Sequence, residues 1–408
     1  MASFDDNNLP VGARIRLHRD RIGMSRPVLA GLVGRSPEWL KAVENGRLHP
    51  PRLPMLLRLA RALGLADLAD LTGNGYAVPV SVYAGPQHPA LTAVQTALTE
   101  YRTGTASAEP DLAHLVLRLD QAWRIRHASP DHRTQLGALL PGLIRDAQSL
   151  ARNATGDDRR SARKLLSGVY QLTDFYVAYQ PAPELVWLVA DRALAEAYEA
   201  DDPFTIGGAT WAMVQALRDA GRWEEALALA DSAIRALTTH LDSAPPDWHG
   251  MVGALEAEVA YVYARRGRYG DAWRHWERAD RIATTLGPDY RHTQSSFSQP
   301  VMAAHATTLG VELHRPGEAL RAAAAIDPAT IASVPRRSRH LIETARAESQ
   351  REDHHAALAL LEQAAQVAPE TIRYNGFARD IVHSLVARPP AGTRDRLRDL
   401  ERRIGLAA

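Results

Sequence analysis

The 408-residue chain contains no cysteine. This absence excludes disulfide bonds, thiolate metal sites and thiol-based catalysis, and it suits a reducing compartment. The chain also has no run of about 18 uninterrupted apolar residues, so we expect no transmembrane helix. Its first ten residues, MASFDDNNLP, have neither a basic start nor an apolar stretch and predict no export signal. We therefore expect a cytoplasmic protein that does not bind membranes.

Lysine is scarce, because Lys41 and Lys164 are the only lysines among 48 basic residues. Together with the abundance of alanine, this bias is typical of a GC-rich genome such as that of an actinomycete. The 47 acidic residues leave a net charge of +1, but residues 1–76 hold eleven Lys or Arg against seven Asp or Glu. The remainder of the chain is therefore net acidic. A basic N-terminal segment favours electrostatic attraction to nucleic-acid phosphates.

Residues 26–45, RPVLAGLVGRSPEWLKAVEN, have the spacing of two helices that cross at a tight turn. Ala30 lies where the helices approach each other, and Gly34 lies at a turn that requires a positive φ. Ser36 is expected to cap the second helix, with Pro37 at its first position. The apolar contacts of this pair are expected from Leu29, Leu32, Leu40 and Val43.

Three more helices are predicted around this pair. Residues 11–22 form an amphipathic helix with Ile15 and Leu17 directed inward. Residues 53–63 form another helix with an apolar face, and a short helix over residues 66–71 ends before a glycine. Five short helices and no strand are therefore predicted for the first 72 residues.

This five-helix pattern resembles the lambda-repressor-like, xenobiotic-response-element (XRE) family of DNA-binding domains. The matching stretches within residues 10–72 are ARIRLHRDRIGMS, LAGLVGRSPEWLKAVENG and LLRLARALG. The resemblance implies that the second helix of the pair enters the major groove of double-stranded DNA. Many members have Gln where this chain has Arg26, and the phosphate contact of that Gln is assigned here to Arg26.

The early exposed residues of the second helix are the candidates for contacts with bases. Glu38 is suited to accept a hydrogen bond from cytosine, and Lys41 to donate one to guanine or to a phosphate. Trp39, considered alone, is more typical of packing than of base recognition. Arg52 is a further candidate for phosphate contacts. The resemblance gives these candidate DNA-binding residues: Arg26, Arg35, Ser36, Pro37, Glu38, Trp39, Lys41, Ala42, Asn45 and Arg47.

A change of composition marks the end of this domain. Residues 73–89, GNGYAVPVSVYAGPQHP, contain three glycines and three prolines, and a second weak stretch follows at residues 103–111. The two stretches bracket a helix predicted at residues 90–101. We therefore expect a helix-turn-helix domain at residues 1–72, a linker at residues 73–110 and a helical body at residues 111–408.

The body contains a repeated signature. GRWEEAL at residues 221–227 and GRYGDAW at residues 267–273 lie 46 residues apart, with weaker copies at residues 316–320 and 354–358. In each copy Gly ends one helix, the aromatic residue fills the corner and Ala lets the next helix pack closely. The signature resembles tetratricopeptide repeats and predicts an all-α chain with an α-solenoid body. An all-helical body of unrelated architecture is the alternative.

Stacked hairpins of this kind direct the first helix of each pair toward a concave face. The residues predicted to line that face and to bind a ligand are Trp211, Gln215, Arg218, Tyr261 and Arg265. A mixture of aromatic and polar groups suits a peptide or a small molecule. The alternative is that Trp211 and Tyr261 only fill space between repeats.

Other patterns predict no catalysis. His354 and His355 are adjacent and point to different sides of a helix, so they cannot share one metal ion. The Ser295-Ser296 pair is interpreted as a solvated turn, and the Arg336-Arg337 doublet as a chance pair on the surface. Phosphate-binding loops and nucleophile elbows are absent from the sequence. We predict no enzyme, metal site or cofactor.

The two parts together resemble bacterial transcription regulators with an XRE-type domain and a tetratricopeptide-like body, among them quorum-sensing regulators of Gram-positive bacteria and actinomycete regulators. The resemblance implies a homodimer on a palindromic operator, with its two heads roughly 34 Å apart. It also implies that the body senses a small-molecule or peptide effector. Two alternatives remain: a protein-interaction adaptor, and an antitoxin-like control protein whose body binds a protein partner.

Overall fold

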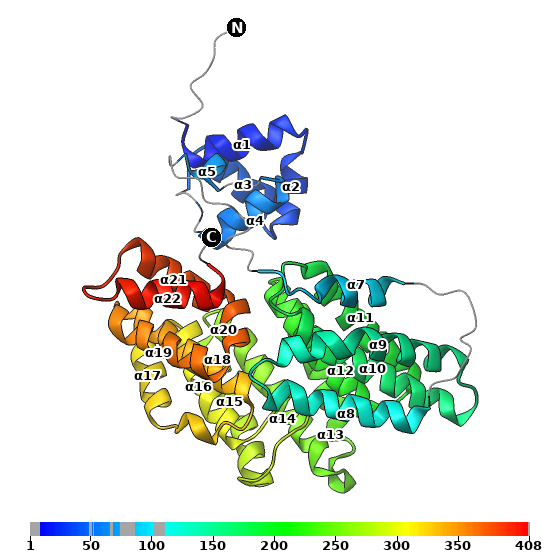
Figure 1. Ribbon diagram of the computed structural model, residues 1–408. Helices are drawn as coiled ribbons and strands as arrows, with labels where there is room; N and C mark the ends of the chain where they lie inside the picture. The colour runs from blue at the N-terminus through cyan, green and yellow to red at the C-terminus, as the bar shows by residue number, and fades with distance from the viewer. Residues whose placement is uncertain are drawn as a thin grey trace. The chain divides into compact units, whose positions relative to one another are not determined.

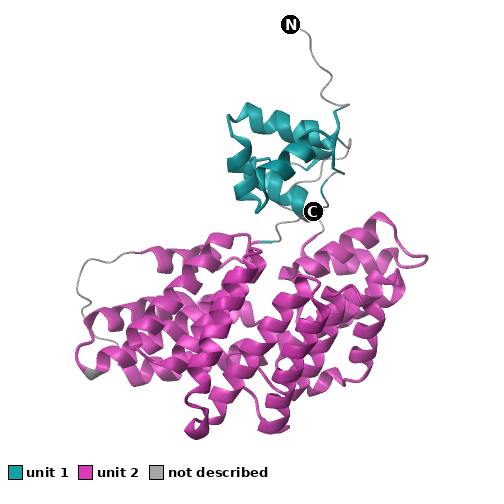
Figure 2. Cartoon of the chain, turned by 180° about the vertical axis from the view of Figure 1, so that it is seen from behind, with its two compact units in different colours: residues 1–86 teal, residues 87–408 magenta. Residues whose placement is uncertain are grey.

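The computed structural model describes residues 9–48, 51, 53–65, 68–73, 86–100 and 111–406. Within these ranges all regular secondary structure is helical, as predicted. The chain divides into two compact units, residues 1–86 and residues 87–408, here called the head and the body (Figure 2). No helix in the described ranges is long and apolar enough to cross a membrane.

The head contains the predicted helices (Figure 1). They are α1 (Val11–Arg21), α2 (Arg26–Leu32), α3 (Pro37–Glu44), α4 (Leu53–Ala62) and α5 (Ala69–Thr72). The short helix begins later than expected, and Ala66 lies outside the described residues. The side chains of Ile15, Leu29, Leu40 and Leu59 are completely buried and form the core between the helices.

The turn between α2 and α3 has the predicted geometry. Gly34 has a φ of +68°, and the N–H of Arg35 donates to the carbonyl of Ala30 over 2.8 Å. Ser36 caps α3 by accepting a hydrogen bond from the N–H of Trp39 over 3.2 Å. The local sequence signals at this turn therefore identified both the end of α2 and the start of α3.

One predicted core position of the head is wrong. Leu32 is 62% exposed, and Val33 is buried in its place at 2%. Val33 lies four residues after Leu29 and three after Ala30, which are both buried, so it shares their face of the helix. Leu32 falls outside that face. Ile15 is buried as expected, whereas Leu17 is only partly buried.

A close approach fixes the distance between α1 and α3. A Cβ added to Gly12 would lie 2.0 Å from the carbonyl oxygen of Val43. Such a distance is far inside van der Waals contact, so only glycine fits at this position. Gly12 therefore lets the first helix of the head pack directly on the C-terminal end of α3.

The body is a series of helical hairpins (Figure 1). The helices are α7 (Leu91–Thr99), α8 (Leu112–Ala128), α9 (His132–Asn153), α10 (Asp157–Val177), α11 (Pro183–Ala200), α12 (Pro203–Asp219), α13 (Trp223–Thr238), α14 (Pro246–Arg265), α15 (Tyr269–Leu286), α16 (Gln299–Glu312), α17 (Pro316–Ala324), α18 (Val334–Gln350), α19 (His354–Val367), α20 (Pro369–Tyr374), α21 (Gly376–Ala387) and α22 (Arg394–Ile404). From α8 to α19, each even-numbered helix packs against the helix that follows it.

The same tight turn joins four of these hairpins. Gly221 and Gly267 have φ values of 77° and 73°, and the turns at residues 314 and 352 keep a positive φ with His (55°) and Glu (63°). In every case the next N–H donates to a carbonyl five residues back, over 2.8–3.0 Å. The weak copies at residues 316–320 and 354–358 therefore follow turns of the same geometry.

Contacts between the first helices of successive hairpins close the body on itself. Each of α8, α10, α12, α14 and α16 contacts the next in the series, and α18 contacts α8 again. The ring of His127 joins the two ends, because its Nε2 donates to the carbonyl of Thr293 over 2.8 Å and its Nδ1 lies 3.0 Å from Ser333 Oγ. The first helices of the hairpins thus lie on the inner side of the body, as predicted, and they form a closed ring.

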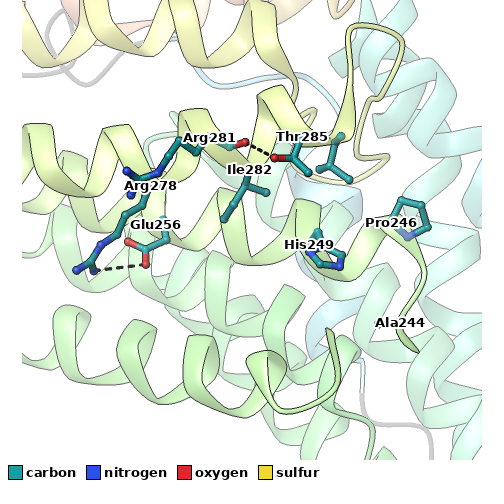
Figure 3. A pocket seen from close by; sticks show the side chains of 9 residues that line it. Ala244, Pro246, His249, Glu256, Arg278, Arg281, Ile282 and Thr285 are labelled. Atoms are coloured by element: carbon teal, nitrogen blue, oxygen red, sulfur yellow. Dashed lines mark hydrogen bonds and ion pairs between the residues drawn. The ribbon is translucent and has the colours of Figure 1, made fainter. Parts of the chain in front are cut away.

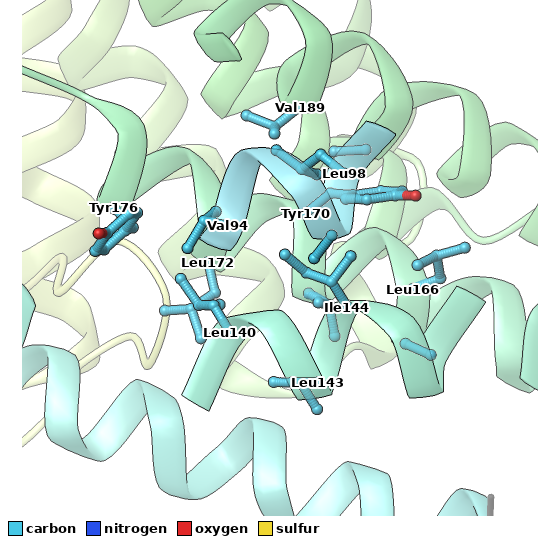
Figure 4. Packing of buried hydrophobic residues seen from close by; sticks show 14 of the residues in the cluster. Val94, Leu98, Leu140, Leu143, Ile144, Leu166, Tyr170, Leu172, Tyr176 and Val189 are labelled. Carbon is cyan, nitrogen blue, oxygen red and sulfur yellow. The ribbon is translucent and has the colours of Figure 1, made fainter. Parts of the chain in front are cut away.

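The helix expected at residues 90–101 is α7, and it packs into the body. Leu91, Val94 and Leu98 are buried against a cluster that includes Leu140 and Ile144 of α9 (Figure 4). The second compact unit therefore begins at residue 87, within the segment interpreted as a linker from residue 73 to residue 110. Residues 74–85 and 101–110 of that segment lie outside the described residues.

Candidate functional sites

Helix α3 has one buried face and one exposed face. Leu40, Val43 and Glu44 are buried, whereas Glu38 and Lys41 are exposed. Asn45, the residue that ends the helix, is also exposed and continues the face of Glu38 and Lys41, because residues at positions i, i+3 and i+7 share one side of a helix. The outer face of α3 therefore presents a row of polar side chains.

Cations flank this row at both ends of α3. Arg35 is exposed and stacks on the partly buried ring of Trp39, at 5.4 Å from its centroid. Arg47 follows the helix and is exposed, as is Ser36 at its start, whereas Pro37 and Ala42 are partly buried. Arg52 lies outside the described residues.

A buried ion-pair cluster holds the three helices at the centre of the head together. Glu44 of α3 has a fully buried side chain, which accepts from Arg19 Nε of α1 and from Arg26 Nε of α2, each over 2.6 Å. The hydrogen bond that Arg19 donates to Glu44 raises the pKa of Arg19. The Nε of Arg26 is therefore already hydrogen-bonded to Glu44 within the head. Sequence analysis missed Glu44, although its position four residues after the buried Leu40 placed it on the core face.

The inner helices of the body surround a cavity of about 160 Å³. Of the residues predicted to bind a ligand, Gln215, Arg218 and Tyr261 line it. Trp211 does not line the cavity: it is 2% exposed, and its ring centroid lies 5.6 Å from that of Phe175, which does line it. The complete lining is Arg126, His132, Arg133, Asp174, Phe175, Ala178, Tyr179, Gln215, Arg218, Glu258, Tyr261, His305, Thr308, Pro335, Arg336, Arg339, Thr371 and Asn375.

Alternating charges form a chain along the inner helices beside this cavity. Arg218 pairs with Glu258 and with Asp219, at 3.1 Å for the latter. Arg265, which does not line the cavity, extends the chain from Asp219 (2.7 Å) to Glu312. The chain then continues from Glu312 through Arg346, Glu343 and Arg339. These arginines therefore have carboxylate partners within the body.

Three further arginines of the lining form no ion pair with a carboxylate among the described residues. Arg336 donates to Ser296 Oγ over 3.1 Å and to the carbonyl of Ser295 over 2.9 Å. Arg133 donates from Nη1 to the carbonyl of Tyr176. The Nε and Nη1 atoms of Arg126 are buried, and no described residue forms a hydrogen bond with either.

Burial of these cations changes their pKa values. Burial, together with Arg133 and Arg336, lowers the pKa of Arg126 to about 9, so the side chain stays charged at neutral pH. Burial also lowers the pKa of Arg133 and of Arg336. His305 adds no charge, because burial lowers its pKa to about 3. Five arginines and two carboxylic acids therefore line the cavity, which makes it cationic.

Two predictions about polar doublets of the body are wrong. Ser295 and Ser296 do not form a solvated turn, since both are buried. Arg336 is not a chance surface residue, because it lines the cavity and bonds to that serine pair. Ser296 and Tyr179 both have a positive φ, at 56° and 65°, which is uncommon outside glycine. The burial of the serine pair and the place of Arg336 have no local sequence signal, because both depend on contacts between residues about 40 positions apart.

A larger and more open groove of about 540 Å³ lies between α14 and α15 (Figure 3). Glu256 in this groove pairs with His275 at 2.5 Å and lies 3.8 Å from Arg278. None of the described residues that line the groove has a buried polar atom without a partner. The central cavity contains several, on Arg126, Arg133 and Asp174 among others. The cavity is therefore the stronger candidate for a ligand site.

Comparisons with known proteins identify the head. Residues 10–71 match the family model described as a helix-turn-helix domain. No curated protein matches the chain significantly. The match covers the five helices α1 to α5 almost completely, so a helix-turn-helix domain is present at the N-terminal end of this chain.

Several solved structures are similar over most of the chain. A mutant of PrgX is 10% identical, with a TM-score of 0.34 over 84% of this chain and 95% of that one. PlcR from Bacillus thuringiensis, in complex with the peptide PapR7 and DNA, is 12% identical, with a TM-score of 0.27 over 86% and 98%. Apo ComR from S. thermophilus is 11% identical, with a TM-score of 0.30 over 94% and 99%. At these TM-scores the superpositions are loose, and the description of the body rests on its own helix pairing.

Proposed function

We propose that this protein is a DNA-binding transcription regulator in which α3 enters the major groove and the body responds to an effector. The exposed polar face of α3, on a head that matches the helix-turn-helix family, is the observation that carries the proposal. A helix presented in this way fits the width of the major groove. The basic excess of residues 1–76 supplies attraction to the phosphates.

Base and phosphate contacts are divided along α3. Glu38 and Lys41 lie on its outer face, where their side chains reach base edges. Arg35 and Arg47 lie beyond the two ends of the helix and are placed for phosphates, which position the domain without carrying sequence information. Asn45 is assigned to the same phosphate contacts. Arg26 is the weakest member of the set, since Glu44 already uses its Nε.

Replacing Lys41 tests this assignment with a matched control. We expect Lys41→Ala to lower the affinity for a mixed-sequence duplex pool about tenfold, because a hydrogen bond to a base edge in the major groove is lost. Lys164 is the only other lysine, and its Nζ pairs with Asp202 in the body at 2.6 Å. Lys164→Ala is expected to leave the affinity unchanged. Equal effects of both substitutions in a gel-shift titration would contradict the proposal.

The proposed regulator acts as a homodimer on a palindromic operator. Two heads about one helical turn apart, roughly 34 Å, meet two half-sites on the same side of the duplex. The body is proposed to set this separation, and an effector changes it only by binding two arrangements with different affinity. Sedimentation of the full chain with and without operator DNA measures the assembly state. A monomer in both conditions would exclude this arrangement.

The effector is proposed to be a small molecule or a peptide that occupies the central cavity. Gln215, Arg218 and Tyr261 contribute to its wall, and their mixture of amide, guanidinium and phenol groups suits a polar ligand. The effector should change DNA affinity in the gel-shift titration described above. A ligand that binds the body without any such change would not be the effector.

A further inference from the structure

We propose that the central cavity binds a compact oxyanion, a carboxylate or phosphate group, between Arg126, Arg133 and Arg336. The inference names the chemical class of the effector and in that respect rests on the proposed function. Anion binding itself can be measured without DNA. The two ideas therefore fail independently.

The guanidinium of Arg126 is unsatisfied. Its Nε and Nη1 atoms are buried, have no hydrogen-bond partner among the described residues and belong to a side chain that lines the cavity. The guanidinium lies over the ring face of Phe175, 4.8 Å from the centroid. Buried polar groups are normally hydrogen-bonded, and a buried cation without a partner is more costly than a neutral group. A bidentate oxyanion satisfies both free donors.

The other two arginines of the cavity are paired. Arg218 and Arg339 are matched by Glu258 and Glu343, so the body already neutralises them. Arg126, Arg133 and Arg336 form no such ion pair among the described residues, although Glu370 and Glu258 act through space to raise the pKa of Arg133 and of Arg336. Burial lowers the pKa of all three, and for Arg126 the other two cations add to this effect. These three cations therefore lack the direct ion pairs that the other two arginines of the lining have.

The cavity is small and polar. A volume of about 160 Å³ corresponds to roughly five water molecules and is smaller than the pockets that hold drug-sized ligands. The cavity thus has room for a compact metabolite or for the end of a peptide. Asp174 Oδ1, also buried without a partner, faces the same cavity and is suited to a hydroxyl or amino group on the ligand.

The first test needs no ligand. Arg126→Met removes the charge while keeping most of the volume, so the dialysed full-length protein should unfold at a higher temperature than the wild type. The matched control is Arg218→Met, which strands Glu258 and should lower the midpoint of unfolding. A lower midpoint for Arg126→Met would show that Arg126 is a structural residue, and would overturn the proposal.

The second test is titration calorimetry of the full chain at constant ionic strength, with NaCl as the blank. The probes are succinate, inorganic phosphate, and one short peptide with either a free or an amidated C-terminus. We expect at least one anionic probe to bind, and to bind about tenfold more weakly to Arg126→Met. Binding of succinate or phosphate alone identifies a free small anion. Binding of the free-ended peptide, but not of its amide, identifies a chain end. No binding by any probe overturns the proposal.

Discussion

At the scale of single residues, the sequence draws attention to exposed charges, whereas buried charges hold the head together and line the cavity of the body. Local signals correctly located Gly34 and Ser36, because a positive φ and an N-cap depend on a few neighbouring residues. Two buried charged residues, Glu44 of the head and Arg126 of the body, were missed. The spacing of Glu44 from Leu40 placed it on the core face, but its ion pairs depend on helices elsewhere in the chain, as does the burial of Arg126.

Glu44→Gln is expected to destabilise the head strongly. The substitution removes the carboxylate that Arg26 contacts and leaves Arg19 with the half-exposed Asp20, which lies 2.6 Å away. Loss of one partner of a buried ion pair typically costs about 3–5 kcal/mol. Hydrogen exchange of the full-length protein should show faster exchange in α1, α2 and α3. Glu38→Gln changes an exposed glutamate on the same helix and should stay within about 0.5 kcal/mol of the wild type. Similar exchange in the two variants would contradict this role for Glu44.

Asp174 is expected to make the stability of the body depend on pH. Burial raises the pKa of its carboxyl group to about 7, above the value of roughly 4 in the unfolded chain. Its contribution to stability is therefore fully present below about pH 4 and is lost as the pH rises to about 7. Asp174→Asn should equal the wild type at low pH and exceed it above neutrality. Parallel curves from denaturant titrations over this pH range would contradict the assignment.

At the scale of elements, the helices and their turns were largely predictable. The periodicity and the caps of α1 to α4 identified these helices to within a residue or two, and the Gly-aromatic signature located two of the body's tight turns. Leu32 was assigned to the core because a short helix offers too few turns to define its buried face. The turns at His314 and Glu352 have the same hydrogen bonds without glycine, so their sequence signal is weaker although the geometry is unchanged.

The repeated turn can be tested by exchanging residues in two of its copies. Glu352→Gly should raise the free energy of unfolding by up to about 1 kcal/mol, because glycine relieves the left-handed strain. Gly267→Ala should lower it by about 1 kcal/mol, since a Cβ there meets no atom within 4 Å and the cost is conformational alone. Urea titrations of both variants measure the two changes. A loss of stability in Glu352→Gly would show that the turns are not equivalent.

At the scale of the whole molecule, ring closure was not predictable from the repeats. A repeat signature describes how one hairpin meets the next, whereas closure depends on contacts of α8 with α18 and of α9 with α20. Glu370 of α20 accepts the N–H of Arg133 over 2.6 Å and that of Thr134 over 3.2 Å, at the start of α9. Its carboxylate lies 3.9 Å from His88 Nε2, near the start of the body. Arg133 therefore lines the cavity, and its backbone N–H also helps to close the ring.

Glu370→Ala is expected to loosen this closure. The first N–H groups of α9 lose a carboxylate cap, which typically costs about 1 kcal/mol, and amide exchange at residues 132–136 should accelerate. Glu362→Ala is a suitable control, because that carboxylate pairs with the exposed Arg396 on the outside of the body. Hydrogen exchange with mass spectrometry resolves the two regions. Unchanged exchange at the start of α9 would show that the ring closes without Glu370.

Recognition of specific DNA by α3 is the central claim, and selection of duplexes from a random pool tests it most directly. The full-length protein is incubated with the pool at low ionic strength, and the retained duplexes are sequenced over several rounds. The account predicts enrichment of one motif with two related half-sites about one helical turn apart. Retention of no duplex, or retention without enrichment of any sequence, would contradict it.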